Sequence, residues 1–348
     1  MSKIKIVRLK DVTFNEVADK HLEMITKKTS DKDREYISKL KPFIGGIYMS
    51  KLIRPKELGD PKHALNKYVL KRSKDNVTAN TVNKELSILN TIGRKAVREY
   101  DLISSKCWEN IRLLDESEEN RLNFQPSKIK SHLEPEWEKI LLDLMPPLTR
   151  DMAKFSIHTG QRESIVCNLM WCWLHTDTWD DKEISYFRVP KNLTKSNRHI
   201  KEDVFIVLND VALFIISKYR NNNSKYVFTE SGDPISKINN SSYQTARIRA
   251  SFVHREIGNT DVHSFKRTFV TRLTEKEVPY VWVQRLANHK LSSVTEKYVK
   301  MSSLTRKVAW LYLQRIVTKG DRDEINQQNK KSNEEHKKKN YCDRQDVK

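Results

Sequence analysis

The chain has 348 residues, of which 32% are charged and 37% are hydrophobic. This length suits two domains with cores of their own, and scarce glycine and proline favour a helix-rich globular protein over a disordered or all-β chain. Because 65 Lys and Arg outnumber 45 Asp and Glu, the net charge of +20 predicts a polyanionic partner, with simple solubility as the alternative.

Neither a membrane span nor a secretion signal is visible in the sequence. No apolar run approaches the roughly 18 residues that cross a bilayer, and the opening MSKI lacks the apolar core of a signal peptide. We therefore expect a cytoplasmic protein without a membrane partner. The cysteines lack the paired short spacing of zinc sites and are expected to stay reduced. They are Cys107, Cys167, Cys172 and Cys342.

After a short extension, residues 1–12, the chain shows helical periodicity as far as residue 108. The clearest stripe follows a polar cluster of N-cap candidates, Thr78, Asn80 and Thr81, and consists of Val82, Leu86, Leu89, Ala96 and Tyr100. Shorter helices are expected over residues 14–28, 31–42 and 60–72. Residues 13–108 therefore predict a four-helix domain.

Residues 109–131 lose this periodicity. The stretch ESEENRLNFQPSKIKS changes from acidic to basic and contains Pro126, which is typical of an interdomain linker. Helical spacing returns after it, so a second domain is expected over residues 132–318. Residues 319–348 are almost all polar and are expected to form a disordered tail.

The second domain is expected to carry a small antiparallel sheet among its helices. Residues 184–189 and 204–208 are rich in β-branched and aromatic side chains, and they flank the polar turn KNLTKSNR. Further helices are expected to begin near residues 210, 239, 261, 279 and 292. The predicted fold class is mainly α with a small antiparallel β-sheet, an α+β arrangement.

Two stretches of this domain offer single cations that could bind an anion. In HTGQRES, the pair Thr159 and Gly160 predicts a helix end that brings Arg162 to the start of the next helix, where backbone N–H groups favour anions. Lys195 lies in the strand-connecting turn KNLTKSNR. Taken singly, each has a common alternative as a solubilising surface charge.

The stretch HSFKRTF combines a histidine with two cations. A helix over residues 261–275 would bury apolar side chains spaced four residues apart, namely Phe265, Phe269 and Leu273. That arrangement leaves His263 and Lys266 pointing at a common neighbour. The alternative for His263 is a capping or core histidine.

Further on, ANHKLSSVTEKY places Tyr298 nine residues after His289. With these motifs in this order, the chain resembles the tyrosine recombinase family, the phage-type integrases. The resemblance covers roughly residues 128–318 and is densest in TGQRES, HSFKRTFVTRL and VPYVWVQRLANHKLSSVTEKY. The four-helix N-terminal unit also fits the family's SAM-like core-binding domain.

The resemblance implies that DNA strands are cleaved and rejoined without a cofactor or metal. Tyr298 would be the nucleophile that forms a 3′-phosphotyrosyl bond, and the planar fork of Arg162 would hold two phosphate oxygens. Lys195 would protonate the leaving 5′ oxygen. His263 and His289 would hydrogen-bond the phosphate and assist proton movement.

The HSFKRTF stretch departs from the family pattern. Most members have arginine at the position of Lys266, and commonly histidine at that of Arg267. Lysine keeps the positive charge of arginine but lacks its planar guanidinium fork. Arg267 is the next residue of the helix, so its side chain is turned by about 100° around the helix axis. The family's usual acidic residue is replaced by Ile165. These departures allow three interpretations. We favour a working but slower enzyme. The others are a DNA-binding protein that cleaves poorly and a site with a compensating donor.

The resemblance further implies a site-specific recombinase of a mobile element that holds double-stranded DNA in a two-domain clamp. Four protomers would assemble on two DNA segments, with accessory DNA-bending or directionality proteins as further partners. The helix after the nucleophile carries Leu304, Val308 and Leu311, which could dock on a neighbouring protomer or pack in cis. A type IB topoisomerase and a catalytically silent DNA-binding regulator are the alternative functions.

Overall fold

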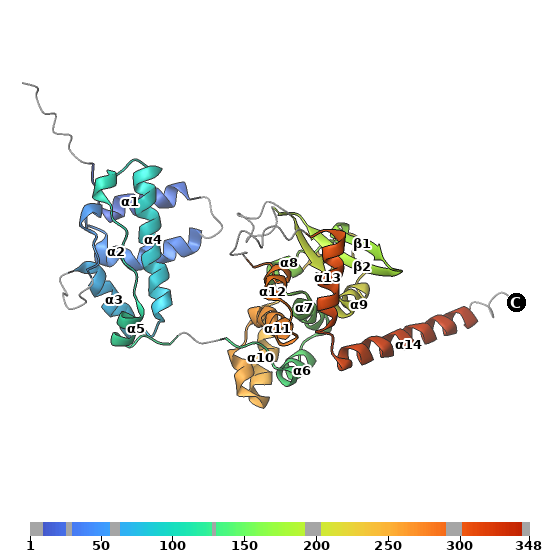
Figure 1. The fold of residues 1–348 in the computed structure, drawn as a ribbon. Helices are drawn as coiled ribbons and strands as arrows, with labels where there is room; N and C mark the ends of the chain where they lie inside the picture. Colours follow the sequence, from blue (N-terminus) through green and yellow to red (C-terminus); the bar gives the residue numbers. More distant parts are fainter. Residues whose placement is uncertain are drawn as a thin grey trace, which may run out of the picture. The chain divides into compact units, whose positions relative to one another are not determined.

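The structure of the chain, a computed structural model, describes residues 10–25, 30–55, 63–126, 130–191, 203–289 and 301–342. The chain divides into two compact units, Met1–Lys128 and Ile129–Lys348, each with a core of its own (Figure 1). Helices dominate both units, and the second also contains a small antiparallel sheet. The predicted fold class is confirmed.

The first unit is a set of helices around one apolar core. Its helices are α1 Phe14–Met24, α2 Ser30–Ile44, α3 Ala64–Lys74, α4 Ala79–Arg98 and α5 Glu116–Arg121, with short 3-10 turns at Met49–Lys51 and Ser105–Cys107. Thr13 and Glu16 form a capping box at the start of α1, and the Thr78 hydroxyl accepts the Thr81 N–H at the start of α4. Helix α4 buries four members of the predicted stripe, Val82, Leu86, Leu89 and Ala96, and ends before the fifth, Tyr100.

The segment expected to be a linker, residues 109–131, is in large part packed onto the first unit. Ile111 and Leu114 are 4% and 6% exposed and join its core. Helix α5 then begins with a capping box formed by Asp115 and Glu118. The predicted linker is therefore too long, because the run of charges conceals two apolar anchors and a capped helical turn.

The second unit contains a three-stranded antiparallel sheet of order β1-β2-β3. The strands are β1 Leu174–Trp179, β2 Lys182–Val189 and β3 Val204–Val207, with a separate ribbon of β4 Thr229–Glu230 and β5 Asp233–Pro234. Strands β2 and β3 match the two predicted ones. Strand β1 escapes prediction because its sequence, LHTDTW, is polar and largely exposed.

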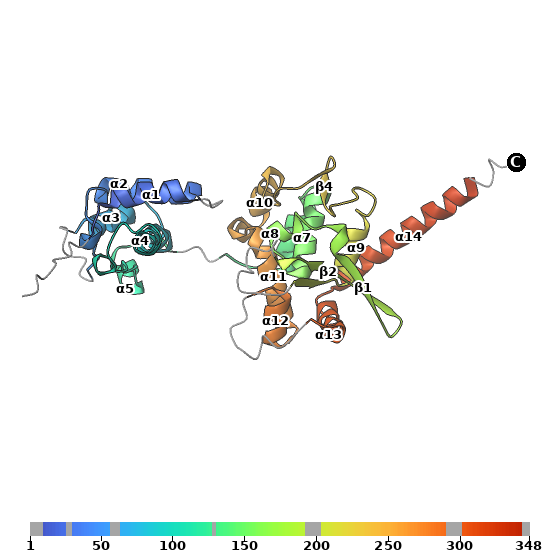
Figure 2. The same ribbon diagram turned by 90° about the horizontal axis from the view of Figure 1, so that it is seen from above.

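The β1–β2 hairpin projects from one side of the second unit, whose other elements are mostly helices (Figure 2). These helices are α6 Pro135–Asp143, α7 Pro147–Thr159, α8 Glu163–Val166, α9 Asp210–Ser217, α10 Ser241–Val253, α11 Val262–Glu275, α12 Tyr280–Leu286, α13 Ser303–Gln314 and α14 Lys319–Cys342, with 3-10 turns at Trp171–Trp173 and Arg255–Asn259. None of the helices in the described parts of the chain combines the length and apolar composition of a membrane-crossing helix.

Helix α11 carries the HSFKRTF stretch and packs along α7. Phe265, Phe269 and Leu273 are fully buried, as predicted. Helix α7 ends at Gly160, whose φ of 64° is left-handed and where a Cβ would meet the Phe269 ring at 2.3 Å. Glycine is therefore required for this close approach, and the turn it forms leads to Arg162 at the N-cap of α8.

Two helices end the second unit. Helix α13 packs on β2 and β3 and buries Ala309 and Leu313. Helix α14 is anchored in its first turn by Asp321, which pairs with Lys154 of α7 at 2.8 Å. The expectation of a disordered tail therefore does not hold for residues 319–342, because their polar composition conceals this anchor.

Candidate active site

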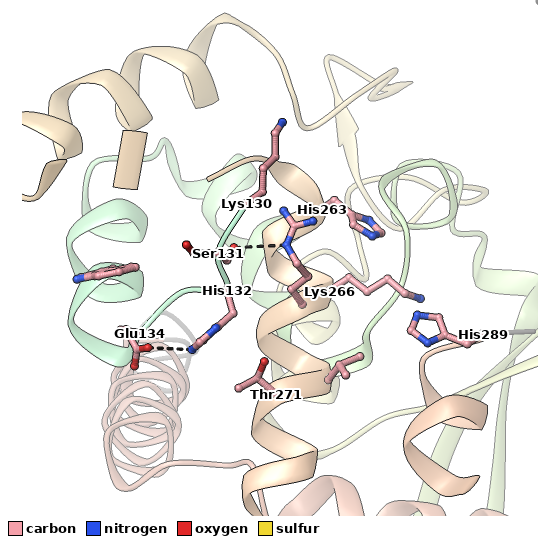
Figure 3. A pocket seen from close by; sticks show the side chains of 11 residues that line it. Lys130, Ser131, His132, Glu134, His263, Lys266, Thr271 and His289 are labelled. Carbon is pink, nitrogen blue, oxygen red and sulfur yellow. Dashed lines mark hydrogen bonds and ion pairs between the residues drawn. The ribbon is translucent and has the colours of Figure 1, made fainter. Parts of the chain in front are cut away.

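Residues from three separate stretches meet beside the first turns of α11. Arg162 follows the Gly160 turn, His263 and Lys266 lie on α11, and His289 comes just after α12. Figure 3 shows the Lys266 amine pointing toward His289, with His263 nearby on the same helix. The other two predicted site residues, Lys195 and Tyr298, lie outside the residues that the structure describes.

Lys266 and His263 line two cavities. The smaller, of about 230 Å³, is also lined by Arg162 and Glu163. The larger, of about 450 Å³, is also lined by His289 and by the segment that enters the second unit at residues 130–134. The predicted residues that the structure describes therefore share one continuous wall.

Lys266 holds two of these stretches together. Its side chain is buried, with the residue only 2% exposed, and its ammonium donates hydrogen bonds to the Gly160 carbonyl at 2.9 Å and to the Ala287 carbonyl. Gly160 lies two residues before Arg162, and Ala287 lies two residues before His289. An ammonium has three N–H donors, so one donor is left for a ligand.

Burial and neighbouring positive charges lower the pKa values of Lys266, His263 and His289. Burial and the Arg162 guanidinium lower the pKa of Lys266 to about 7. Burial and the charges of Arg267 and Lys266 lower the pKa of His263, and burial with the charges of Lys266 and Arg162 lowers that of His289. Both imidazoles are therefore largely neutral at pH 7, where each can accept or donate a proton.

A further contact joins the two motifs and was not foreseen from the sequence. The Asn288 side-chain amide donates to the Gln161 side-chain oxygen at 2.8 Å, and the Gln161 amide donates to the Thr159 carbonyl at 2.8 Å. Gln161 is 2% exposed. Because each partner directly precedes Arg162 or His289, this bond helps to fix the spacing of those two side chains.

A ring of cations and neutral imidazoles suits an anion whose charge is spread over several oxygens, as in a phosphodiester. This chemistry agrees with the comparison of the sequence with known families, in which residues 133–304 match the model of the phage integrase family. The second unit belongs to the phage integrase family.

Solved integrases have the same fold. The Tn1549 transposon integrase, in complex with transposon right end DNA, is 15% identical with a TM-score of 0.58, over 86% of this chain and 98% of that one. A lambda integrase dimer bound to a COC′ core site is 16% identical with a TM-score of 0.50, over 84% and 78%. A lambda integrase tetramer bound to a Holliday junction is 15% identical with a TM-score of 0.50, over 84% of this chain and 80% of that one. No curated protein matches the chain.

The positions that depart from the integrase pattern have structural roles of their own. The Arg267 guanidinium pairs with Asp261 at 2.7 Å, at the N-cap of α11. Ile165 is 8% exposed and joins the core. Arg267 is thus directed to the helix cap.

Proposed function

We propose that this integrase family member is a site-specific DNA recombinase that cleaves and rejoins DNA through a 3′-phosphotyrosyl intermediate. The observation that carries the proposal is the convergence of Arg162, His263 and Lys266 on one cavity, with His289 beside Lys266. These side chains come from stretches far apart in sequence, and their donors suit a phosphate.

In the proposed reaction, the Tyr298 oxygen attacks the phosphorus of a DNA phosphodiester. A bond forms between that oxygen and the 3′-phosphate, and the bond to the 5′ oxygen breaks, with Lys195 supplying the proton to the leaving oxygen. A neutral imidazole, His263 or His289, accepts the phenolic proton. Attack by a 5′-hydroxyl of a partner strand reverses these steps and rejoins the DNA, so no external energy source is needed.

Charge stabilisation in this reaction comes from Arg162 and Lys266. The guanidinium fork of Arg162 binds two non-bridging oxygens, and the remaining N–H of Lys266 binds one. Because lysine offers a point charge without a fork, we propose a working recombinase whose cleavage step is slower than that of family members whose sites are built around arginine at this position. The carbonyl contacts of Lys266 indicate that its surroundings are adapted to lysine.

Double-stranded DNA is the proposed partner of both units. The net charge of +20 supplies phosphate contacts. We propose assembly of four protomers on two DNA segments, in line with the lambda integrase tetramer on a Holliday junction. Accessory DNA-bending or directionality proteins and a cytoplasmic site of action belong to the same proposal.

The proposal is tested with a library of nicked duplexes of random sequence, in which the nick lets the short cleaved fragment diffuse away. The expected result is a covalent protein–DNA adduct that disappears in Tyr298→Phe. Tight DNA binding without any adduct would instead identify a catalytically silent regulator. Relaxation of supercoiled DNA without sequence preference would identify a type IB topoisomerase.

A further inference from the structure

The chain enters the second unit alongside the catalytic helix α11. The Lys130 ammonium pairs with the Asp261 carboxylate at 2.8 Å. The Ser131 carbonyl accepts from Arg267 Nε at 3.4 Å, and the buried backbone N–H of Leu133 donates to a hydroxyl of α11 at 2.8 Å. Figure 3 shows Lys130 and Ser131 lying next to the turn that carries His263.

Asp261 is the junction of these contacts. One of its carboxylate oxygens accepts the Ser264 backbone N–H at 3.0 Å, which caps α11, and also the Arg267 guanidinium at 2.7 Å. The other oxygen accepts from Lys130. Partial burial raises the pKa of Asp261, but Lys130 and Arg267 outweigh this and lower it overall, so the carboxylate stays ionised at neutral pH.

Asp261 is the N-cap of α11, the helix that carries His263. His263 lies two residues after this cap, in the first turn of α11. Lys130 lies two residues after Lys128, where the first unit ends. One carboxylate therefore links the entry of the second unit to the turn that orients a phosphate-binding imidazole.

We infer that Lys130, Asp261 and Arg267 form a linker latch, which couples the entry segment of the second unit to the orientation of His263. Arg267 is then a positioning residue that acts through Asp261 and does not touch the phosphate. The inference rests on the proposed function, since it assigns the latch to the cleavage step.

A double-mutant cycle tests the latch, measuring the single-turnover cleavage rate, the Kd for DNA and its salt dependence. The variants are Lys130→Ala, Asp261→Asn and both together. Asparagine caps a helix about as well as aspartate, so Asp261→Asn removes the ion pairs and keeps the cap. Lys139→Ala, which removes an exposed lysine of α6, is the matched control for the loss of one charge.

The latch predicts that each single variant slows cleavage about two- to fivefold, the range of a partly exposed ion pair. The double variant should be no slower than the slower single variant. The Kd for DNA and its salt dependence should stay unchanged, and Lys139→Ala should cleave at the wild-type rate. If these contacts served folding alone, the variants would have a smaller folded fraction, and cleavage and DNA binding would fall together.

The latch would be overturned if the rate losses of the two single variants multiplied in the double variant and the DNA binding of Lys130→Ala depended less steeply on salt. Lys130 would then contact a DNA phosphate directly. Equal rates in all variants would overturn it as well. Absence of an adduct with the wild-type protein would instead contradict the proposed function. An adduct in the wild-type protein without coupling in the cycle contradicts the latch alone.

Discussion

Lys266 occupies a position that differs chemically from an exposed phosphate-binding cation. Its ammonium is buried and holds the carbonyls of Gly160 and Ala287, which precede Arg162 and His289. A guanidinium is larger and planar, so it cannot occupy the same point between two carbonyls without moving one of the stretches. The lysine therefore holds the stretches that carry Arg162 and His289 in place, and it also supplies a positive charge.

This arrangement predicts that Lys266→Arg does not raise the rate of DNA cleavage and lowers it by at least about fivefold, because overpacking costs about 1–3 kcal/mol. Lys266→Met, which also loses the charge, should lower the rate about 10²- to 10³-fold. Single-turnover cleavage of an adduct-forming substrate measures both. A strong gain in Lys266→Arg would show that the chain is an impaired recombinase.

The same residue predicts a pH dependence. With a pKa of about 7, Lys266 is protonated below pH 7 and loses its charge as the pH rises above it, so the cleavage rate should fall across that range. Arginine stays protonated throughout, so the rate of Lys266→Arg relative to wild type should increase from pH 6 to about pH 9. A constant ratio would contradict a titrating Lys266.

Sequence order alone grouped Arg162, His263, Lys266 and His289, because each lies in a short recognisable motif. The burial of Lys266 could not be read from HSFKRTF, since helical spacing leaves it on the open face and its acceptors lie 106 and 21 residues away. The bond between Gln161 and Asn288 spans 127 positions. Local patterns carry no information on such contacts.

At the scale of elements, the close packing of α7 on α11 positions the site. Gly160→Ala should lower the free energy of unfolding by more than about 2 kcal/mol, because the new Cβ meets the Phe269 ring at 2.3 Å in a left-handed backbone conformation. Chemical denaturation measures the loss, and cleavage should be lost with it because the acceptor of Lys266 moves.

Gly232→Ala is the matched control for this prediction. Gly232 also has a positive φ, of 91°, but beyond its two chain neighbours no heavy atom of the described residues lies within 4 Å of the point that a Cβ would occupy. Its substitution should therefore cost only the backbone strain, about 1–2 kcal/mol. Equal losses for the two variants would show that the contact with Phe269 is unimportant.

Helix α13 packs in cis by one face and leaves another face open. Ala309 and Leu313 are buried, while Leu304 and Leu311 are 55% and 48% exposed. If the open face docks on a neighbouring protomer, Leu304→Ser with Leu311→Ser should reduce tetramers on DNA and leave monomer binding unchanged, as measured by analytical ultracentrifugation. Unchanged tetramers would favour packing in cis alone.

Elements with strong periodicity, such as α4 and α11, were predictable because each buries a stripe of apolar side chains at helical spacing. Elements that are held in place by tertiary contacts were not predictable from the sequence. The linker segment depends on the burial of Ile111 and Leu114, and α14 depends on Asp321 pairing with Lys154 across the fold. In both, charged neighbours dominate the local composition and hide the anchors.

At the scale of the whole molecule, the central claim is that the second unit of a strongly basic chain breaks and reseals DNA through Tyr298. The family of residues 133–304 and the arrangement of Arg162, His263, Lys266 and His289 support it. Integration and excision would use the same cleavage step, so the claim covers both.

Protease digestion of trapped protein–DNA adducts, followed by mass spectrometry of the peptide and sequencing of the DNA, tests this claim most directly. The account predicts one peptide, linked through Tyr298 to a 3′-phosphate, and a recurring DNA sequence at the break. A link through another residue, a 5′-phosphate linkage, or no adduct at all would contradict it.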